Sequence, residues 1–90
     1  MVSKEVLIPN KPGLESKVAA KFIQKASSYQ SQIWVEKNER RANAKSLLGL
    51  LSLSIYQGAK IIITAEGNDE EKAVNELEEY IQCGMTEELV

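Results

Sequence analysis

The stretch that decides the fold is Asn43-Ala44-Lys45-Ser46-Leu47-Leu48-Gly49-Leu50-Leu51-Ser52-Leu53, which is rich in leucine. Ser46 stands directly before the apolar run, as is typical of the residue that caps the N-terminus of a helix. The hydroxyl of such a serine lies beside backbone N–H groups that have no partner inside the helix, and this place favours an anion. A phosphate on Ser46 would add about −1.5 to −2 charges there.

The leucines of this stretch cannot all face inward. If Leu50 and Leu53 face a core, the remaining three lie partly outside, because helical neighbours on one face are three or four residues apart. The outward leucines are Leu47, Leu48 and Leu51. The sequence thus predicts an apolar patch beside a serine that can be phosphorylated. The alternative interpretation is an ordinary capped helix of the core.

Strands and helices are expected on both sides of this helix. In order, they are a strand over Val2–Ile8, a loop over Pro9–Gly13, a helix from Leu14–Ser16 to about Ser27, a strand around Ile33–Val35, a turn over Lys37–Arg40, a strand over Arg41–Asn43, the leucine helix, a strand over Lys60–Glu66 and a last helix from about Asn68 to Gly84. The residues after Gly84 are expected to form a frayed acidic tail. This order predicts an α+β two-layer sandwich, with the helices on one face of a mostly antiparallel sheet.

Side-chain periodicity assigns the faces of these elements. Ile61, Ile63 and Ala65 are expected to face the helices, with Ile62 and Thr64 on the other side of the sheet. The first helix shows an apolar face made of Val18, Ala19, Phe22, Ile23 and Ala26, and the last helix one made of Ala73, Val74, Leu77, Tyr80 and Ile81.

Two polar patterns accompany these helices. Asn68 and Glu71 fit a capping box at the start of the last helix. Lys17, Lys21 and Lys25 recur every fourth residue and form a basic stripe, either a solvated face or a contact surface.

Composition limits the chemistry. The chain has 90 residues, which suits one domain over residues 1–90, and it contains no histidine and one cysteine, Cys83. A histidine triad, a histidine phosphocarrier, a histidine-ligated metal and an internal disulfide are therefore excluded; we expect no metal, no cofactor and no enzymatic activity. A formal net charge of −2 argues against a direct nucleic-acid partner. The N-terminus lacks the apolar core of a signal peptide, and no apolar run is long enough to cross a membrane, so a cytoplasmic protein is expected.

Several motifs with their spacing resemble the HPr family, the small phosphocarriers of the bacterial sugar phosphotransferase system. They are Lys4-Glu5-Val6, Gly13-Leu14, Ala19-Ala20, Glu36-Lys37, the unbroken Asn43-Ala44-Lys45-Ser46-Leu47-Leu48-Gly49, Ser52-Leu53, Gln57-Gly58 and Ala65-Glu66-Gly67-Asn68-Asp69-Glu70-Glu71. The resemblance covers nearly the whole chain. It implies an open-faced βαββαβα sandwich, with a four-stranded antiparallel sheet in the order 1-4-2-3 and three helices on one face.

One departure from the family is decisive. The phosphocarrier motif Gly-Leu-His-Ala-Arg-Pro-Ala becomes Gly13-Leu14-Glu15-Ser16-Lys17-Val18-Ala19. Glu15 thus occupies the position of the phosphorylated histidine, and Lys17 replaces an arginine, which loses the planar bidentate guanidinium. The chain is similar in type to the histidine-lacking catabolite repression HPr proteins.

The resemblance also implies a function. Ser46 matches the serine that HPr kinase/phosphorylase phosphorylates, and the phosphorylated form is the corepressor of a LacI-type catabolite control protein. The expected contact surface is Glu15, Lys17, Ala20, Lys21, Ser46, Leu47, Leu48 and Leu51. The missing histidine argues against enzyme I as a partner.

Two alternatives stay open. The chain could be a phosphocarrier that uses Glu15 as an atypical acceptor, since carboxylates do form acyl phosphates. It could also be an interaction module that binds without modification. Glu15 itself has two interpretations: a neutral loss of the histidine, or a weak permanent imitation of its phosphorylated form, with about one negative charge in place of nearly two.

Overall fold

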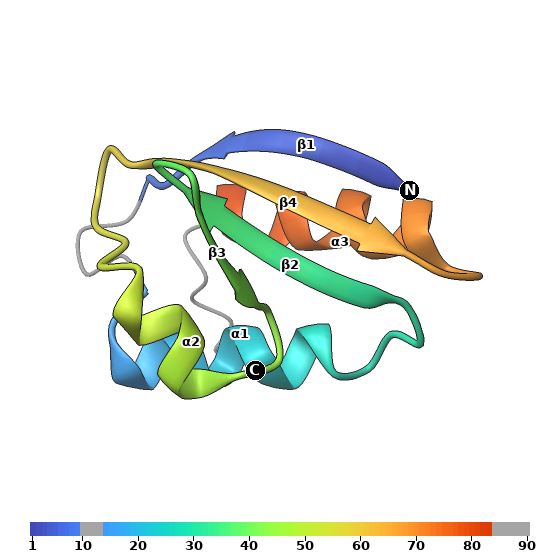
Figure 1. Cartoon of the computed structure of the whole chain (residues 1–90), viewed down its shortest axis with the longest axis horizontal. Helices are drawn as coiled ribbons and strands as arrows, with labels where there is room; N and C mark the ends of the chain where they lie inside the picture. The colour runs from blue at the N-terminus through green and yellow to red at the C-terminus, as the bar shows by residue number, and fades with distance from the viewer. Residues whose placement is uncertain (10–13, 84–90) are drawn as a thin grey trace.

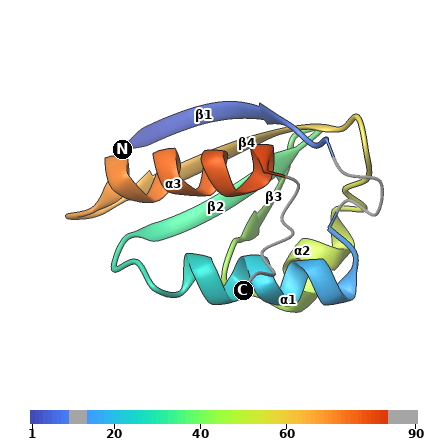
Figure 2. The same cartoon turned by 180° about the vertical axis from the view of Figure 1, so that it is seen from behind.

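The computed structural model describes residues 1–9 and 14–83, which form an α+β sandwich (Figure 1). Its elements are β1 Val2–Leu7, α1 Ser16–Ala26, β2 Gln32–Lys37, β3 Arg40–Asn43, α2 Leu47–Ser52, β4 Lys60–Glu66 and α3 Glu70–Gln82. The four strands make one antiparallel sheet in the order β1-β4-β2-β3. The helices lie on one side of this sheet, as Figure 2 shows from behind. The predicted fold class and strand order are confirmed.

Strand β4 lies at the centre of the sheet, between β1 and β2. Its bounds are those predicted, because a run of β-branched residues with alternating burial is a strong local pattern. Ile61, Ile63 and Ala65 are fully buried toward the helices, whereas Ile62 on the other face is 37% exposed. The register places Ile63 between Lys4 of β1 and Val35 of β2. The central strand therefore supplies the floor of the core.

The core lies between the sheet and one face of each helix (Figure 2). The fully buried helical side chains are Ala19, Phe22 and Ala26 of α1, Leu50 of α2, and Ala73, Val74, Leu77 and Ile81 of α3. Val18, Ile23 and Tyr80 are partly buried against them. Burial of one large aliphatic side chain contributes about 1.5–3 kcal/mol. The predicted apolar faces of both long helices are thus confirmed, with these three residues at their margins.

Strand β1 places a charged residue, Lys4, on the face that packs against the core. Lys4 lies on the same face as buried Val6, yet its ammonium reaches past the core to Glu78 of α3, with Nζ 2.9 Å from Oε1. The strand ends at Leu7, one residue earlier than predicted. Ile8 remains buried, and its N–H donates to the carbonyl of Ala59 at 2.9 Å.

The open face of the sheet carries Trp34 of β2. The guanidinium carbon of Arg41 lies 4.6 Å from the centroid of the Trp34 ring, a cation–π contact between β2 and β3. On the same face Ser3 and Thr64 share a hydrogen bond of 2.9 Å. Trp34 therefore has a structural place on the open face of the sheet.

The predicted capping box at α3 is wrong. The helix begins at Glu70, one residue later than a cap at Asn68 requires. Asp69 stands at the N-cap, and its side chain makes no capping hydrogen bond. The Asp69 carboxylate instead accepts hydrogen bonds from the backbone N–H groups of Gln30 and Ser31, both at 2.9 Å. Donors from another loop thus hold Asp69, and the N-cap lies one residue after the predicted Asn68. The predicted stop at Gly84, the tail after it and loop residues 10–13 lie outside the described residues.

Candidate functional site

Ser46 caps α2 as the sequence predicts. Its backbone is extended, with φ −114° and ψ 117°, and its Oγ accepts a hydrogen bond from the N–H of Gly49 at 3.1 Å. The turn before it is closed by Asn43, whose side-chain oxygen accepts from the N–H of Lys45 at 2.8 Å. Ser46 is partly exposed. Its hydroxyl is therefore fixed in place at the head of the helix, and part of the side chain faces solvent.

Gly49 is explained by close packing inside the same turn. A Cβ at this position would lie 3.2 Å from the Cβ of Ala42 in β3 and 3.2 Å from the Oγ of Ser46. Any larger residue would push α2 away from the sheet or displace the serine hydroxyl. The glycine of the Asn-Ala-Lys-Ser-Leu-Leu-Gly motif thus belongs to the geometry of the serine.

The leucines of α2 divide between core and surface as expected. Leu50 is fully buried and Leu53 is 4% exposed, whereas Leu47 is 41% and Leu48 is 81% exposed. Leu51 is partly buried. An exposed apolar patch is costly to leave in water and is typical of a contact surface. The chain thus presents two leucines immediately after the capping serine.

Helix α1 lies beside α2 and brings the other predicted residues to the same end of the molecule (Figures 1 and 2). Glu15 stands at the N-cap of α1 with an extended backbone and makes no side-chain capping bond. Lys17, Ala20 and Lys21 follow on α1, and all three are exposed. The ion pairs among residues 1–9 and 14–83 involve neither lysine. The two lysine charges are thus open to a partner.

The third lysine of the basic stripe behaves differently. Lys25 is partly buried, and its Nζ lies 5.8 Å from the centroid of the Tyr29 ring. It also lies in the last turn of α1, where a cation interacts favourably with the helix dipole. The stripe is therefore split between an exposed part and a lysine engaged in the fold.

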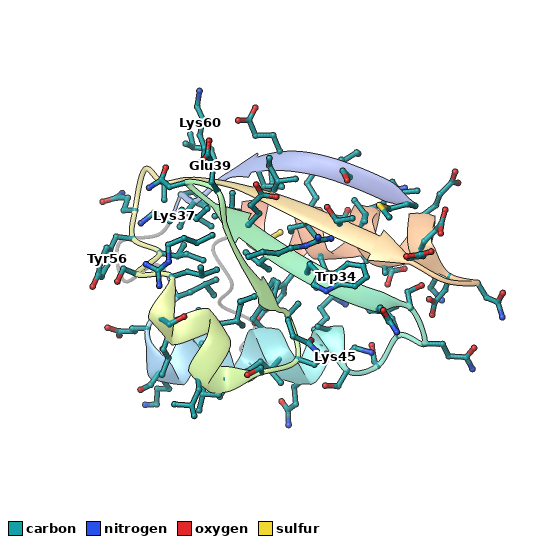
Figure 3. All side chains as sticks on the ribbon, in the orientation of Figure 1. Trp34, Lys37, Glu39, Lys45, Tyr56 and Lys60 are labelled. Carbon is teal, nitrogen blue, oxygen red and sulfur yellow. The ribbon has the colours of Figure 1, made fainter. Side chains whose placement is uncertain are left out.

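Two further lysines hold the serine helix, and sequence reasoning missed both (Figure 3). Lys45 Nζ donates to the carbonyls of Tyr29 and Ser31, at 2.9 and 3.1 Å. Lys37 Nζ donates to the carbonyls of Ser54 and Leu53 after α2, at 2.6 and 3.3 Å. A lysine that bonds distant carbonyls leaves no periodic pattern in the sequence. The motif containing Lys45 marks the position without revealing its partners.

A polar cluster anchors the loop before β2. Ser31 is 1% exposed and donates both its N–H and its hydroxyl to Asp69. These bonds lower the pKa of Asp69; the Ser31 hydroxyl is the largest cause, followed by the N–H of Gln30. The neighbouring Tyr29 hydroxyl donates to Glu76 at 2.5 Å, and burial raises the pKa of this phenol. The loop that Lys45 bonds is thus itself fixed to α3.

The described residues hold neither a metal-binding cluster nor a membrane-spanning helix. No group of three or more histidine, cysteine, aspartate or glutamate side chains there could hold a metal ion. No helix over the same residues has the length and apolar character needed to span a bilayer. The exposed end formed by α1 and α2 is the best candidate surface because it unites the motif serine, the leucines and the open lysines.

Comparison with known proteins agrees with this arrangement. Residues 2–82 match the family model for the PTS HPr component phosphorylation site. The HPr-like protein Crh of Halalkalibacterium halodurans is 43% identical over 82 residues, which cover 91% of this chain and 98% of that protein. The crystal structure of HPr-C-His from Thermoanaerobacter tengcongensis superposes with a TM-score of 0.93 at 45% identity, covering 99% of this chain and 100% of that one.

A second similar structure is that of Crh, the catabolite repression protein of Bacillus subtilis, which forms a domain-swapped dimer in its crystal. Its TM-score is 0.75 at 36% identity, over 97% of this chain and 100% of that one. The match to the family model, the relatives along nearly the full chain and the shared strand order all agree: the chain belongs to the HPr family and is an HPr-like protein.

Proposed function

We propose that this chain is an HPr-like regulatory protein of carbon catabolite repression, without enzymatic activity. HPr kinase/phosphorylase would phosphorylate Ser46, and the phosphorylated chain would act in the cytoplasm as corepressor of a LacI-type catabolite control protein. The observation that carries the proposal is the capping serine beside two exposed leucines, on a chain whose family phosphocarrier position holds Glu15.

The chemistry at position 15 favours regulation over phosphoryl transfer. A phosphocarrier needs a nitrogen nucleophile that forms a reversible, high-energy phosphoramidate, and the chain has no histidine. Glu15 offers a carboxylate, whose phosphorylated form would be an acyl phosphate. Nearby Lys17 can approach an anion only as a point charge and lacks the bidentate geometry of arginine. These features argue for a chain that no longer carries phosphate between enzymes.

The surroundings of Ser46 suit a switch by local charge. Its hydroxyl already accepts a backbone N–H, so a phosphate could be attached without reorganising the turn. Because Lys45 is bonded to the carbonyls of Tyr29 and Ser31, the cations that grip a phosphoserine would come from the partner. Exposed Leu47 and Leu48 would add apolar contact beside it. Phosphorylation would then create a recognisable surface while the fold stays unchanged.

The first experiment is intact-mass spectrometry after incubation with ATP and an HPr kinase/phosphorylase, followed by peptide mapping. We expect one phosphate, on Ser46, and none on the Ser46→Ala variant. Ser52→Ala is the matched control, since Ser52 lies in the same helix and its exposed hydroxyl bonds only the carbonyl of Gly49 among the described residues. A chain that stays unmodified while folded would contradict the proposal.

The second experiment separates the alternatives. Binding of a LacI-type repressor should require phosphorylated Ser46; binding that survives Ser46→Ala would indicate a phosphorylation-independent module instead. Phosphoenolpyruvate labelled in its phosphate, incubated with enzyme I, should transfer no label to the chain. Label that appears on the wild type and is lost in Glu15→Gln would assign the chain to the phosphocarriers.

A further inference from the structure

The C-terminal end of α2 is held by a lysine from another part of the chain. Lys37, the last residue of β2, donates from Nζ to the carbonyls of Ser54, at 2.6 Å, and Leu53, at 3.3 Å. In Figure 3 it lies above the end of α2, on the same side of the molecule as Tyr56. A helix has no internal donors for its last carbonyls, and a cation there also interacts favourably with the dipole. Lys37 supplies a hydrogen-bond donor and a positive charge at the C-cap residue Leu53 and at Ser54, the residue after it.

The sequence of α2 does not provide this cation itself. No basic residue lies in the last turn of the helix. The N–H groups of Leu53 and Ser54 satisfy the carbonyls of Leu50 and Leu51, at 3.1 and 3.2 Å, which leaves the carbonyls further along for Lys37. Ser54 adopts φ +54°, a left-handed conformation that is unfavourable for residues other than glycine and persists where neighbours hold it.

Lysines therefore fix both ends of the short helix to the sheet layer. Lys45 bonds the loop before β2 at the start of α2, and Lys37 bonds the end of α2 to the β2–β3 hairpin. Between them Gly49 lets the helix pack closely on Ala42 of β3. With six residues, α2 is too short to be stable on its own. Its orientation therefore depends on tertiary contacts, which include these three attachments and the buried side chains of Leu50 and Leu53.

We propose that Lys37 is a positioning residue: by bonding the carbonyls of Leu53 and Ser54 it sets the orientation of α2, and thereby the placement of Ser46 and the exposed leucines for a partner. The part that concerns a partner rests on the proposed function, whereas the part that concerns the helix does not. Lys37 has no contact with the partner in this scheme. Its charge is used inside the fold.

The test compares Lys37→Met, which keeps an apolar stem and removes the donors, with Lys60→Met as matched control. Lys60 is an exposed lysine at the start of β4, and it donates no side-chain hydrogen bond among the described residues. Amide hydrogen exchange of the free, unphosphorylated chain is measured by NMR. We expect exchange at Leu50, Leu53 and Ser54 to accelerate about tenfold in Lys37→Met, the effect of losing a charge-assisted hydrogen bond. Amides of α3 should keep their rates, and Lys60→Met should change neither helix.

Lys37→Arg should restore slow exchange in α2, because arginine keeps both the charge and the donors. Unchanged exchange in α2 would overturn the proposal. So would equal acceleration in α2 and α3, which would show a loss of global stability in place of a local release. Calorimetry with the Ser46-phosphorylated chain then tests the consequence: repressor binding should weaken several-fold in Lys37→Met and recover in Lys37→Arg. If the phosphorylated wild type binds no repressor, the proposed function fails while the exchange result still decides the role of Lys37.

Discussion

At the residue scale, the side chain at position 15 bears most directly on the choice between a regulator and a phosphocarrier. Glu15 stands at the N-cap of α1, exposed and without a capping bond, beside Lys17. It brings one negative charge to a position where the family carries a histidine that can bear a doubly charged phosphoryl group. Whether that charge matters to a partner can be measured directly, because glutamine has the same shape without the charge.

If Glu15 imitates a phosphorylated histidine, it should oppose the regulatory role proposed for Ser46. Glu15→Gln should then tighten binding of the Ser46-phosphorylated chain to its repressor by about two- to fivefold, the range expected for a solvent-exposed charge. Calorimetry measures the affinity. Glu5→Gln on β1 is the control and should leave it unchanged. An unchanged or weaker affinity for Glu15→Gln would identify a neutral loss of the histidine.

A second residue-scale prediction concerns the hairpin between β2 and β3. Asn38 and Glu39 have φ values of 51° and 69°, the left-handed pair that a two-residue hairpin turn requires. Glutamate tolerates this conformation poorly, so Glu39→Gly should stabilise the protein by about 1 kcal/mol. Urea unfolding measures the change. Glu36→Gly, within β2, should act in the opposite direction, and a loss of stability in Glu39→Gly would contradict the explanation.

The same turn shows what local sequence can and cannot reveal. Asn38 was predictable as a left-handed residue, because asparagine is enriched there. Glu39 was not, since nothing in glutamate indicates a positive φ. Ser54 is a similar case: it adopts φ +54°, and its carbonyl accepts a hydrogen bond from the distant Lys37. Conformations that the fold imposes on unsuited residues leave no mark in the sequence.

At the element scale, helix α2 has one face that packs in the core and another that is exposed to solvent. Burial divides its leucines into Leu50, which fills the core, and Leu48, which projects into solvent. The periodicity predicted this division, since spacing along a helix fixes which residues share a face. Substitution of Leu50 should therefore change the stability of the protein, whereas substitution of Leu48, two residues earlier, should change recognition by a partner.

Leu50→Ala should destabilise the protein by about 2–5 kcal/mol, because it opens a cavity in the core. Leu48→Ala should change stability by no more than about 0.5 kcal/mol. Denaturant unfolding measures both. In the proposed function Leu48→Ala should nonetheless weaken repressor binding, as calorimetry can show. Equal losses of stability in the two variants would contradict the division of faces.

The boundaries of helices and strands were predictable from the sequence only where the signal is local. The bounds of β4 were predictable because its pattern is local: a run of β-branched residues with alternating burial. The start of α3 was not, because Asp69 and not Asn68 stands at the N-cap, and the Asp69 carboxylate is held by Ser31 of a distant loop. The attachments of Lys37 and Lys45 were missed for the same reason. Each depends on a partner that only the folded chain brings near.

At the scale of the whole molecule, the strand order connects distant segments. The order β1-β4-β2-β3 and the helices on one side place α1 beside α2, so that residues around 15–21 and 46–51 lie at one end. The loop before β2 links the start of α2 to the start of α3. Lys45 donates hydrogen bonds to carbonyls of this loop, and Asp69 accepts hydrogen bonds from its N–H groups. The surface around Ser46 is thus connected to α3 through one loop.

This link makes the stability of the molecule depend on pH. The folded pKa of Asp69 is lowered, first by the Ser31 hydroxyl and then by the Gln30 N–H, so the folded state favours the ionised carboxylate. Its contribution is complete above the unfolded pKa of about 3.9 and is lost as the pH falls through the lower folded pKa. Glu70 acts in the same direction, because the N–H of Gly67 lowers its pKa, followed by the N-terminal ammonium.

Asp69→Asn should therefore lower the free energy of unfolding near neutral pH, and its deficit relative to wild type should shrink as the pH falls below about 4. Urea unfolding at a series of pH values measures this difference. Glu71→Gln is the matched control, because Glu71 is an exposed carboxylate in the same turn, and this variant should change the free energy of unfolding only slightly. If the difference in free energy of unfolding between Asp69→Asn and wild type stays constant down to low pH, the geometry of the hydrogen bonds matters and the charge of the carboxylate does not. If it shrinks as expected, the carboxylate charge stabilises the loop that Lys45 also bonds, and acid should loosen the attachment of α2 before the core itself unfolds.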